Sequence, residues 1–371
     1  MPSVQPPSKV LVTGANGYIA MWVVRTLLEN GYFVRGTVRS TSKGDYMRKY
    51  FTELGFTDLE DKLEIVVVKN IETPGAFDDA VKGVHAIEHM ASPYHYGAED
   101  PKELFGPAIS GTVSILQSAQ KYGSSVKRIV ITTSTAAMVR PTDLPITFTE
   151  NDWNEDAIKQ VEIHGVQAPG YLKYFASKTL AEKAAFEFYK KNKEYLSWDL
   201  VTIAPPYVFG PIINEVGNKI TNINTSLIEW YETIFESSKS KEALKDVGNA
   251  WVDVRDLARA HVRAIQREEA IGRVIVSANS FKWHDWLSTA IRVSTSTNPP
   301  ILPLSAFTEP DPTYNHNHTT PSESPTKPHH IHIINFDTSK AEKVLGMKKD
   351  EYITMEDCAR DMIIDFKNRG W

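Results

Sequence analysis

The sequence predicts an α/β protein built around a doubly wound parallel sheet, with a smaller C-terminal lobe. Short runs rich in Val and Ile alternate with helical patterns through the first half of the chain. Uninterrupted apolar strands separated by helices are typical of a parallel sheet that is covered on both faces. A glycine-containing turn joins the first of these runs to the first helix, which fits the same class of fold.

The elements are expected in alternating order along the chain. The first strand is expected over residues 9–14, the first helix over 18–30 and the second strand over 32–39. Further β-branched runs, with helical segments between the early ones, predict strands at 63–70, 85–92, 128–135, 200–206 and 274–279. Two terminal helices are predicted at 338–346 and 354–371.

Length and composition fit such a fold. The 371 residues allow two domains, or one large unit that carries a grafted lobe. Apolar residues make up 42% and charged residues 23%, as in soluble globular proteins. The net charge of -5, with basic residues scattered along the chain, gives little support to nucleic-acid binding. The single cysteine, Cys358, excludes an internal disulfide and a cysteine-based zinc motif, which favours a reducing compartment.

Targeting signals are not expected either. Residues 1–8 contain neither a basic segment nor an apolar one, so no signal peptide is predicted. No apolar run approaches the roughly 18 residues that a membrane helix requires. We therefore expect a cytoplasmic protein without a membrane span.

The turn at residues 12–20, VTGANGYIA, predicts a phosphate-binding site. Its glycines allow a sharp bend and the close approach of an anion, and the following helix N-terminus adds free N–H groups. The pattern is GxxGxxA and not the general GxGxxG, but alanine is small enough for the same packing. A tight turn without a ligand is the alternative, and the position at the first strand–helix junction favours a dinucleotide. Its expected contacts are Gly14, Asn16, Gly17, Tyr18 and Ile19.

The end of the second strand indicates which dinucleotide binds. An NAD site usually holds Asp or Glu here for the ribose hydroxyls, whereas this chain holds Arg39, with Lys43 nearby. A guanidinium can bind a 2′-phosphate through two charge-assisted hydrogen bonds. A solvated surface arginine is the alternative. The absence of acidic residues from 34 to 44 favours NADP(H).

Two tyrosine–lysine pairs share a spacing of four residues, Tyr174–Lys178 and Tyr189–Lys193. This spacing puts both side chains on one face of a helix, so it does not choose between the pairs. Ser134 lies just beyond a predicted strand, at the sheet edge where open α/β folds bind ligands. The second pair lies among charges at the end of its helix, which favours a structural role for it.

A glycine turn, a serine and then a YxxxK pair occur in this order in short-chain dehydrogenases. The sequence resembles the extended short-chain dehydrogenase/reductase family, and within it dihydroflavonol reductases and fungal aldehyde or ketone reductases. Matching stretches include VLVTGANGYIA, KRIVITTSTAA, YFASKTLAEKAA and WVDVRDLARAHV, and they cover most of the chain from Lys9 onward. The resemblance implies a Rossmann fold, NADP(H) as cofactor, and Ser134, Tyr174 and Lys178 as catalytic residues.

The chemistry of these three residues is coherent. A free phenol has a pKa of about 10, and a lysine ammonium one helical turn away is expected to lower the pKa of Tyr174. Tyr174 is then expected to protonate a carbonyl oxygen while the nicotinamide supplies a hydride. Ser134 is expected to hydrogen-bond the same oxygen as negative charge develops. The resemblance implies that Lys178 also holds the nicotinamide ribose.

The resemblance implies further contacts. Expected cofactor contacts are Asn70 and Ile71 at the adenine, Ala91 and Ser92 at the nicotinamide ribose, Pro205 and Val208 near the carboxamide, and Thr132. Expected pocket residues are Tyr94, Met138, Tyr171 and Tyr207, with Tyr96 and Trp230 as additional candidates. Asp253, Asp256 and His261 are expected to be structural.

The chain is expected to divide into two parts. Residues 1–199 should form the NADP-binding domain, and residues 200–371 mainly the substrate-binding lobe, with strands that return to the sheet. Residues 308–328 predict a long surface loop that is either a lid or disordered. The histidines around it lack acidic or cysteine partners at metal-site spacing, so no metal is expected. They are His316, His318, His329, His330 and His332.

The expected reaction is NADPH-dependent reduction of an aldehyde or ketone, by a monomer or homodimer whose partner is a small carbonyl compound. Ala136, Ala137 and Met138 follow the serine region in place of the Val-Tyr-Gly-like run that sugar-nucleotide epimerases usually carry. Two alternatives remain open. One is a sugar-nucleotide epimerase or dehydratase of the same fold, and the other is a non-catalytic NADP-sensing regulator.

Overall fold

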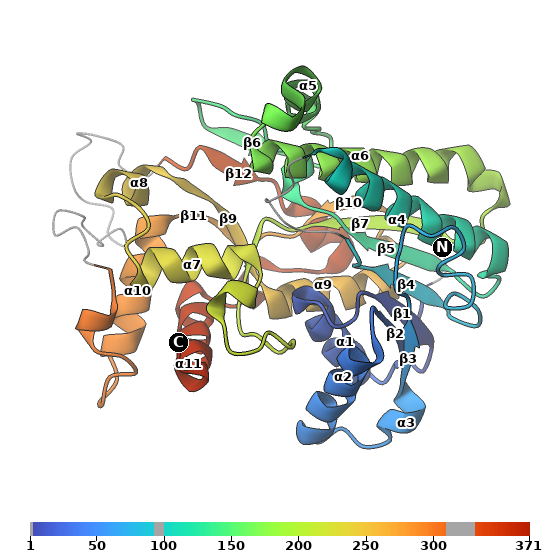
Figure 1. The fold of residues 1–371 in the computed structure, drawn as a ribbon, viewed down its shortest axis with the longest axis horizontal. Coiled ribbons are helices and arrows are strands. Elements are labelled where there is room, and N and C mark those ends of the chain that lie inside the picture. The colour runs from blue at the N-terminus through green and yellow to red at the C-terminus, as the bar shows by residue number, and fades with distance from the viewer. Residues whose placement is uncertain (1–2, 93–99, 309–330) are drawn as a thin grey trace.

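The structure is a computed structural model that describes residues 3–92, 100–308 and 331–371. Its centre is a seven-stranded sheet in the order β10-β7-β5-β4-β1-β2-β3, and every neighbouring pair is parallel (Figure 1). The strands are β1 (Lys9–Thr13), β2 (Phe33–Val38), β3 (Leu63–Val67), β4 (Ala86–His89), β5 (Arg128–Thr132), β7 (Asp199–Ala204) and β10 (Gly272–Ile275). The predicted doubly wound parallel sheet is confirmed, and the strand order reverses between β1 and β4.

Helices cover both faces of this sheet (Figure 1). On one side α4 (Lys102–Tyr122) and α6 (Gly170–Asn192) pack against each other, and α5 (Glu155–His164) packs on α6. On the other side α1 (Tyr18–Glu29) packs against α9 (Val254–Gln266). Next to β2 and β3 lie α2 (Thr41–Glu53) and α3 (Leu59–Lys62).

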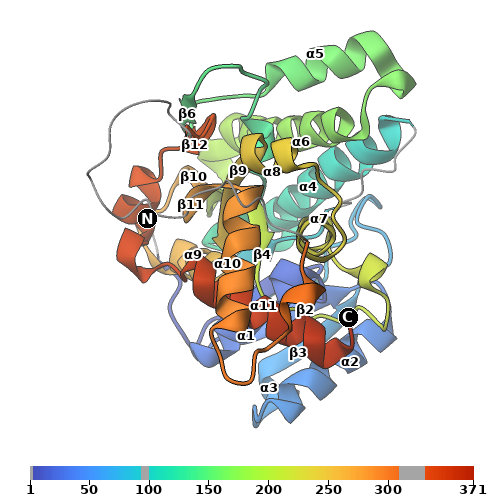
Figure 2. The same cartoon turned by 90° about the vertical axis from the view of Figure 1, so that its left-hand side faces the viewer.

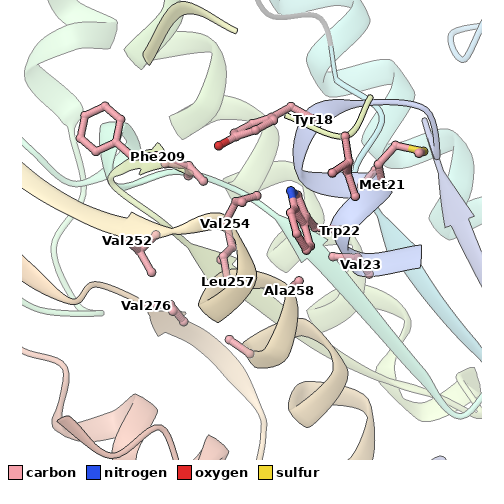
Figure 3. Packing of buried hydrophobic residues seen from close by; sticks show 14 of the residues in the cluster. Tyr18, Met21, Trp22, Val23, Phe209, Val252, Val254, Leu257, Ala258 and Val276 are labelled. Atoms are coloured by element: carbon pink, nitrogen blue, oxygen red, sulfur yellow. The ribbon is translucent and has the colours of Figure 1, made fainter. Parts of the chain in front are cut away.

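The contact between α1 and α9 joins the two halves of the chain into one core (Figure 3). Tyr18 and Trp22 of α1 lie in the same buried cluster as Val254 and Leu257 of α9. The Trp22 indole also donates a hydrogen bond of 2.9 Å to the carbonyl of Pro211. Apolar burial of this kind is the main stabilising contribution to a folded domain, and here it spans residues that are far apart in sequence.

The C-terminal lobe has a small sheet of its own, made of β8 (Tyr207–Phe209), β9 (Gly248–Asp253) and β11 (Asn279–Lys282). Its helices are α7 (Thr225–Phe235), α8 (Lys241–Asp246), α10 (Trp283–Thr295) and α11 (Met355–Arg369), which Figure 2 shows with α10 towards the viewer. Cys358 of α11 is fully buried. A further parallel pair joins β6 (Ile146–Phe148) to β12 (Ile334–Phe336).

Two expectations about the C-terminal region need adjustment. The helix predicted at 338–346 is a single π-helical turn, Ala341–Leu345, which ends at Gly346 in the left-handed conformation. The predicted loop 308–328 lies, except for its first residue, outside the described residues. Among the residues that are described, no helix is long and apolar enough to cross a membrane.

Candidate active site

A cavity of about 610 Å³ lies at the carboxyl ends of β1, β4, β5 and β7. This volume is typical of small-molecule sites, and the position is the one where open α/β sheets bind ligands. Many of the predicted site residues meet here although they come from distant parts of the sequence. Those that line the cavity are Gly14, Gly17, Tyr18, Ile19, Ser92, Thr132, Ser134, Tyr171, Tyr174, Lys178, Pro205, Tyr207 and Val208.

The glycine turn is shaped to hold an anion. Gly14 has a φ of +61°, and a Cβ at this position would lie 3.1 Å from the Cα of Ala91. The amides of Tyr18, Ile19 and Ala20, at the start of α1, have no hydrogen-bond partner among the described residues. Free amides at a helix N-terminus are what a pyrophosphate requires, so these residues fit a dinucleotide.

The Tyr18 side chain has a different function from its backbone. Its hydroxyl donates a hydrogen bond of 2.9 Å to the carbonyl of Gly210 in the C-terminal lobe. Burial raises the pKa of Tyr18 well above its ordinary value, so the hydroxyl keeps its proton for this bond. The first turn of α1 is therefore tied to the segment that follows β8.

Several expected cofactor contacts lie along the sheet edge outside the cavity lining. Arg39 is exposed just after β2 and has no ion-pair or hydrogen-bond partner among the described residues, so its guanidinium is available to a 2′-phosphate. Lys43, by contrast, forms an ion pair of 2.8 Å with Glu215. The side-chain oxygen of Asn70 accepts from the Glu72 amide. The others outside the lining are Asn16, Ile71 and Ala91.

Ser134, Tyr174 and Lys178 form the polar centre of the cavity. The Ser134 Oγ accepts a hydrogen bond of 3.1 Å from the Ala136 amide, which leaves the hydroxyl proton free to be donated. Tyr174 and Lys178 lie one turn apart in α6, with the lysine Nζ 5.7 Å from the centre of the tyrosine ring. Lys178 also makes a hydrogen bond of 3.2 Å with the Ser92 hydroxyl.

The environment of Lys178 brings its titration close to neutrality. Burial lowers its pKa to about 8, and the Glu182 carboxylate opposes this by raising it. Glu182 is itself held by Arg273 at 2.9 and 2.7 Å and by the Thr202 hydroxyl at 2.6 Å. Because Arg273 already balances the Glu182 charge, this carboxylate offsets little of the effect of burial on the Lys178 pKa. A buried lysine with a shifted pKa in a cavity is typical of a functional site.

The competing pair is not part of the cavity. Tyr189 packs against Trp198, with ring centres 5.9 Å apart, in a separate apolar cluster. Lys193 lies beyond the end of α6. The structure thus brings the first tyrosine–lysine pair to the sheet edge and leaves the second in a structural setting.

Two substrate-pocket expectations are wrong. Met138 is fully buried in a small core with Phe148 and Ile275, because the turn after Ser134 directs it away from the cavity. Trp230 is fully buried against Trp286 and other rings of the lobe. Tyr94 and Tyr96 lie outside the described residues. Tyr171 does line the cavity, and half of its surface is exposed.

Some cavity residues escaped the sequence analysis. The C-terminal lobe contributes Asn224, Ser226, Glu229 and Asn249. They lie where the sequence shows no regular pattern, so no local signal marks them. Behind the cavity wall, the buried His261 forms two hydrogen bonds. Its Nδ1 lies 2.7 Å from the Glu88 Oε2, and its Nε2 lies 3.3 Å from the Thr132 Oγ1.

The acidic residues near His261 have structural contacts, as expected. Asp253 accepts a hydrogen bond from the Arg255 amide at the start of α9, and Asp256 accepts one from the Ile353 amide. Across residues 3–92, 100–308 and 331–371, no group of three or more His, Cys, Asp or Glu side chains could hold a metal ion. Of the histidines around the predicted loop, only His332 falls in these ranges.

Comparison with known proteins gives the family. Residues 10–277 match the NAD dependent epimerase/dehydratase family. The chain belongs to this family. Among its relatives, the ketoreductase azaE of Aspergillus niger is 34% identical, over 91% of this chain and 92% of that protein. The dihydroflavonol 4-reductase of Callistephus chinensis is 35% identical, over 75% of this chain and 71% of that protein.

The chain also resembles solved structures in shape. The yeast methylglyoxal/isovaleraldehyde reductase Gre2, in complex with NADPH, superposes with a TM-score of 0.76 and 29% identity, over 98% of this chain and 99% of that one. The expected relationship to dihydroflavonol reductases and fungal carbonyl reductases is therefore confirmed.

Proposed function

We propose that the protein catalyses the NADPH-dependent reduction of an aldehyde or ketone to an alcohol. The observation that carries this proposal is the convergence of Ser134, Tyr174 and Lys178 on one cavity, beside a turn with free amides. A ketoreductase and an NADPH-bound methylglyoxal/isovaleraldehyde reductase among the relatives support the same reaction.

NADPH, when bound, supplies the hydride. The turn amides would hold its pyrophosphate and Arg39 its 2′-phosphate, which fixes the register of the cofactor along the sheet edge. Tyr174 donates its hydroxyl proton to the carbonyl oxygen of the substrate. Ser134 donates a hydrogen bond to the same oxygen, since its own Oγ already accepts from Ala136. The Lys178 ammonium, one turn away, stabilises the phenolate that Tyr174 leaves.

The alternatives have weaker support. A UDP-glucuronic acid 4-epimerase from Bacillus cereus shares the fold at 14% identity. Identity this low indicates a common fold and does not indicate a common reaction. A cofactor-sensing regulator would have no need for a serine, a tyrosine and a lysine gathered at one cavity. Carbonyl reduction uses all three.

The test is a panel of aldehydes and ketones with the purified protein, followed by NADPH absorbance. We expect NADPH loss to match alcohol formation, and NADH to be the poorer cofactor. NADPH binding without turnover of any carbonyl would favour the regulator. Conversion of a nucleotide sugar without net NADPH loss would favour the epimerase.

We also propose a cytoplasmic location and a monomeric or homodimeric state. The single buried thiol suits a reducing compartment. Light scattering of the purified protein tests the oligomeric state, and a tetramer or larger assembly would contradict it.

A further inference from the structure

We infer that the substrate carries a hydroxyl group apart from its reacting carbonyl, and that Asn224 and Glu229 accept hydrogen bonds from it. This inference rests on the proposed carbonyl reduction and names the class of substrate. Both residues line the cavity wall that the C-terminal lobe contributes, whereas Ser134 and Tyr174 line it from the sheet edge.

Asn224 presents an acceptor that lacks a donor. It precedes α7 at the N-cap position, where an asparagine side chain usually accepts from an amide of the first turn. Here the side chain makes no such bond. Its Oδ1 is buried and has no hydrogen-bond partner among the described residues. Because a buried acceptor without a partner is unfavourable, a donor brought by a ligand would be stabilised at this position.

Glu229 presents a second acceptor, held in a fixed orientation. Its Oε2 accepts a hydrogen bond of 3.0 Å from the Tyr207 hydroxyl, and its Oε1 accepts one of 2.9 Å from the Lys239 ammonium. An ionised carboxylate has about four lone-pair sites, so acceptor capacity remains after these two bonds. Lys239 is fixed in turn, with its Nζ 4.9 Å from the centre of the Trp283 ring.

The charges of this wall favour a neutral donor. Lys239 balances the charge of Glu229, so a cationic substrate would gain little from this carboxylate. An anionic substrate would face the Glu229 carboxylate and could accept only from the Asn224 amide nitrogen of this pair. A hydroxyl group supplies a donor for the Asn224 Oδ1 and for the remaining lone pairs of Glu229, without a charge that must be removed from water.

The neighbouring surface can take the carbon skeleton. The Tyr207 ring lines the cavity and packs edge-on against Phe281 and Trp283, with ring centres 5.9 and 6.1 Å apart. The Tyr207 ring can contact apolar atoms of a substrate, and the Glu229 carboxylate lies beside it. Such a combination suits a hydroxyaldehyde or hydroxyketone.

The experiment compares hydroxyaldehydes with unsubstituted aldehydes of the same chain length, with NADPH as the cofactor. We expect the wild-type protein to favour the hydroxylated member of at least one pair by roughly 10-fold to 100-fold in kcat/KM, as for a hydrogen bond to a charged group. In a double variant, Asn224→Leu with Glu229→Gln, this ratio should fall at least roughly tenfold. The matched control is Glu232→Gln, on the same helix but outside the cavity lining, which should keep the wild-type ratio.

The results distinguish hydroxyl recognition by Asn224 and Glu229 from carbonyl reduction itself. Equal kcat/KM within every pair for the wild type would overturn the inference and leave carbonyl reduction intact. A preference that survives in the double variant would also overturn the assignment to these two residues. Failure of the wild type to reduce any aldehyde would contradict the reductase function itself. Turnover of unsubstituted aldehydes by the variants shows that they are folded.

Discussion

Tyr174 and Lys178 are each about 8% exposed, so the proposed proton donor and its cationic neighbour lie almost wholly within protein. Electrostatic interactions between such groups are stronger than they would be in water. The charge of Lys178 also costs stability, because burial disfavours the protonated form. Proposed catalysis and folding therefore make opposite demands on this lysine.

The role of Tyr174 can be tested with a minimal change. Tyr174→Phe removes one hydroxyl and keeps the ring that packs near Phe175. We expect kcat/KM to fall by roughly 100-fold or more, while the Kd for NADPH changes only a few-fold. Tyr189→Phe is the matched control and should retain wild-type kinetics. Activity of Tyr174→Phe above a few per cent of wild type would contradict the assigned proton donor.

Lys178→Met should inactivate the protein and stabilise it. Because the folded-state pKa is about 8 and the ordinary value 10.5, wild type binds fewer protons when folded than when unfolded between these values. Its stability therefore rises with pH across this window. We expect the variant to exceed wild type at pH 7 by roughly 1–3 kcal/mol in the free energy of unfolding, with the gain fading towards pH 10. Urea denaturation at both pH values measures this, and a gain that is independent of pH would contradict it.

Arg39 is the residue on which cofactor preference is proposed to depend. Arg39→Glu should lower the ratio of kcat/KM with NADPH to that with NADH by roughly tenfold or more, since a carboxylate repels the 2′-phosphate. Lys49→Glu makes a charge change of the same size on α2 and should leave the ratio near the wild-type value. An unchanged ratio in Arg39→Glu would show that the 2′-phosphate binds elsewhere.

At the scale of elements, the sequence predicts a strand or helix well where the residues of that element alone determine its structure. The Val- and Ile-rich runs predict β1 and β5, each buried at four of its five residues, because buried parallel strands are apolar on both faces. The strands β8, β9 and β11 have only three to six residues and form through contacts with the aromatic core of the lobe. Their own residues therefore show no pattern that predicts a strand.

The same distinction applies to the candidate site. Gly14, Ser134 and Tyr174 lie in motifs whose spacing marks them. Asn224 and Glu229 reach the cavity only because the lobe folds over it. Met138 and Trp230 show the reverse error, since an apolar residue near a site in sequence can turn into the core. The direction in which a side chain points from a turn or a helix depends on tertiary packing.

One buried ion pair holds two central strands together. Arg128 of β5 contacts Asp199 of β7 through two hydrogen bonds of 2.6 and 2.7 Å, and neither side chain is exposed. Asp199→Ala would leave the guanidinium buried without its counter-charge, and we expect a loss of about 3–5 kcal/mol in the free energy of unfolding. The exposed pair of Asp79 with Lys82 provides the control, and Asp79→Ala should have no measurable effect. Comparable losses in both variants, measured by urea denaturation, would contradict this account.

At the scale of the whole molecule, one apolar cluster runs from Val4 to Phe366 and includes both α1 and α9. A shared core of this kind couples the sheet to the C-terminal lobe. We expect one cooperative thermal transition, with coincident curves from far-UV circular dichroism and tryptophan fluorescence. NADPH at about 100 times its Kd should add about 2.7 kcal/mol to the stability. Two separate transitions, of which only one responds to NADPH, would contradict the shared core.

The single buried cysteine has a practical consequence. Cys358 lies in α11, and this helix touches the segment after β8 through Met362, which accepts from the Gly210 amide, and through Asp365, which accepts from the Ile212 amide. Burial raises the pKa of the Cys358 thiol well above its ordinary value, so alkylating reagents reach a reactive thiolate only when the helix opens. Since Gly210 also accepts the hydrogen bond from Tyr18, the labelling rate reports the opening of a segment tied to the glycine turn. Alkylation of Cys358 adds one mass shift per molecule, and its rate measures the free energy of local opening beside the cavity. No engineered probe is needed.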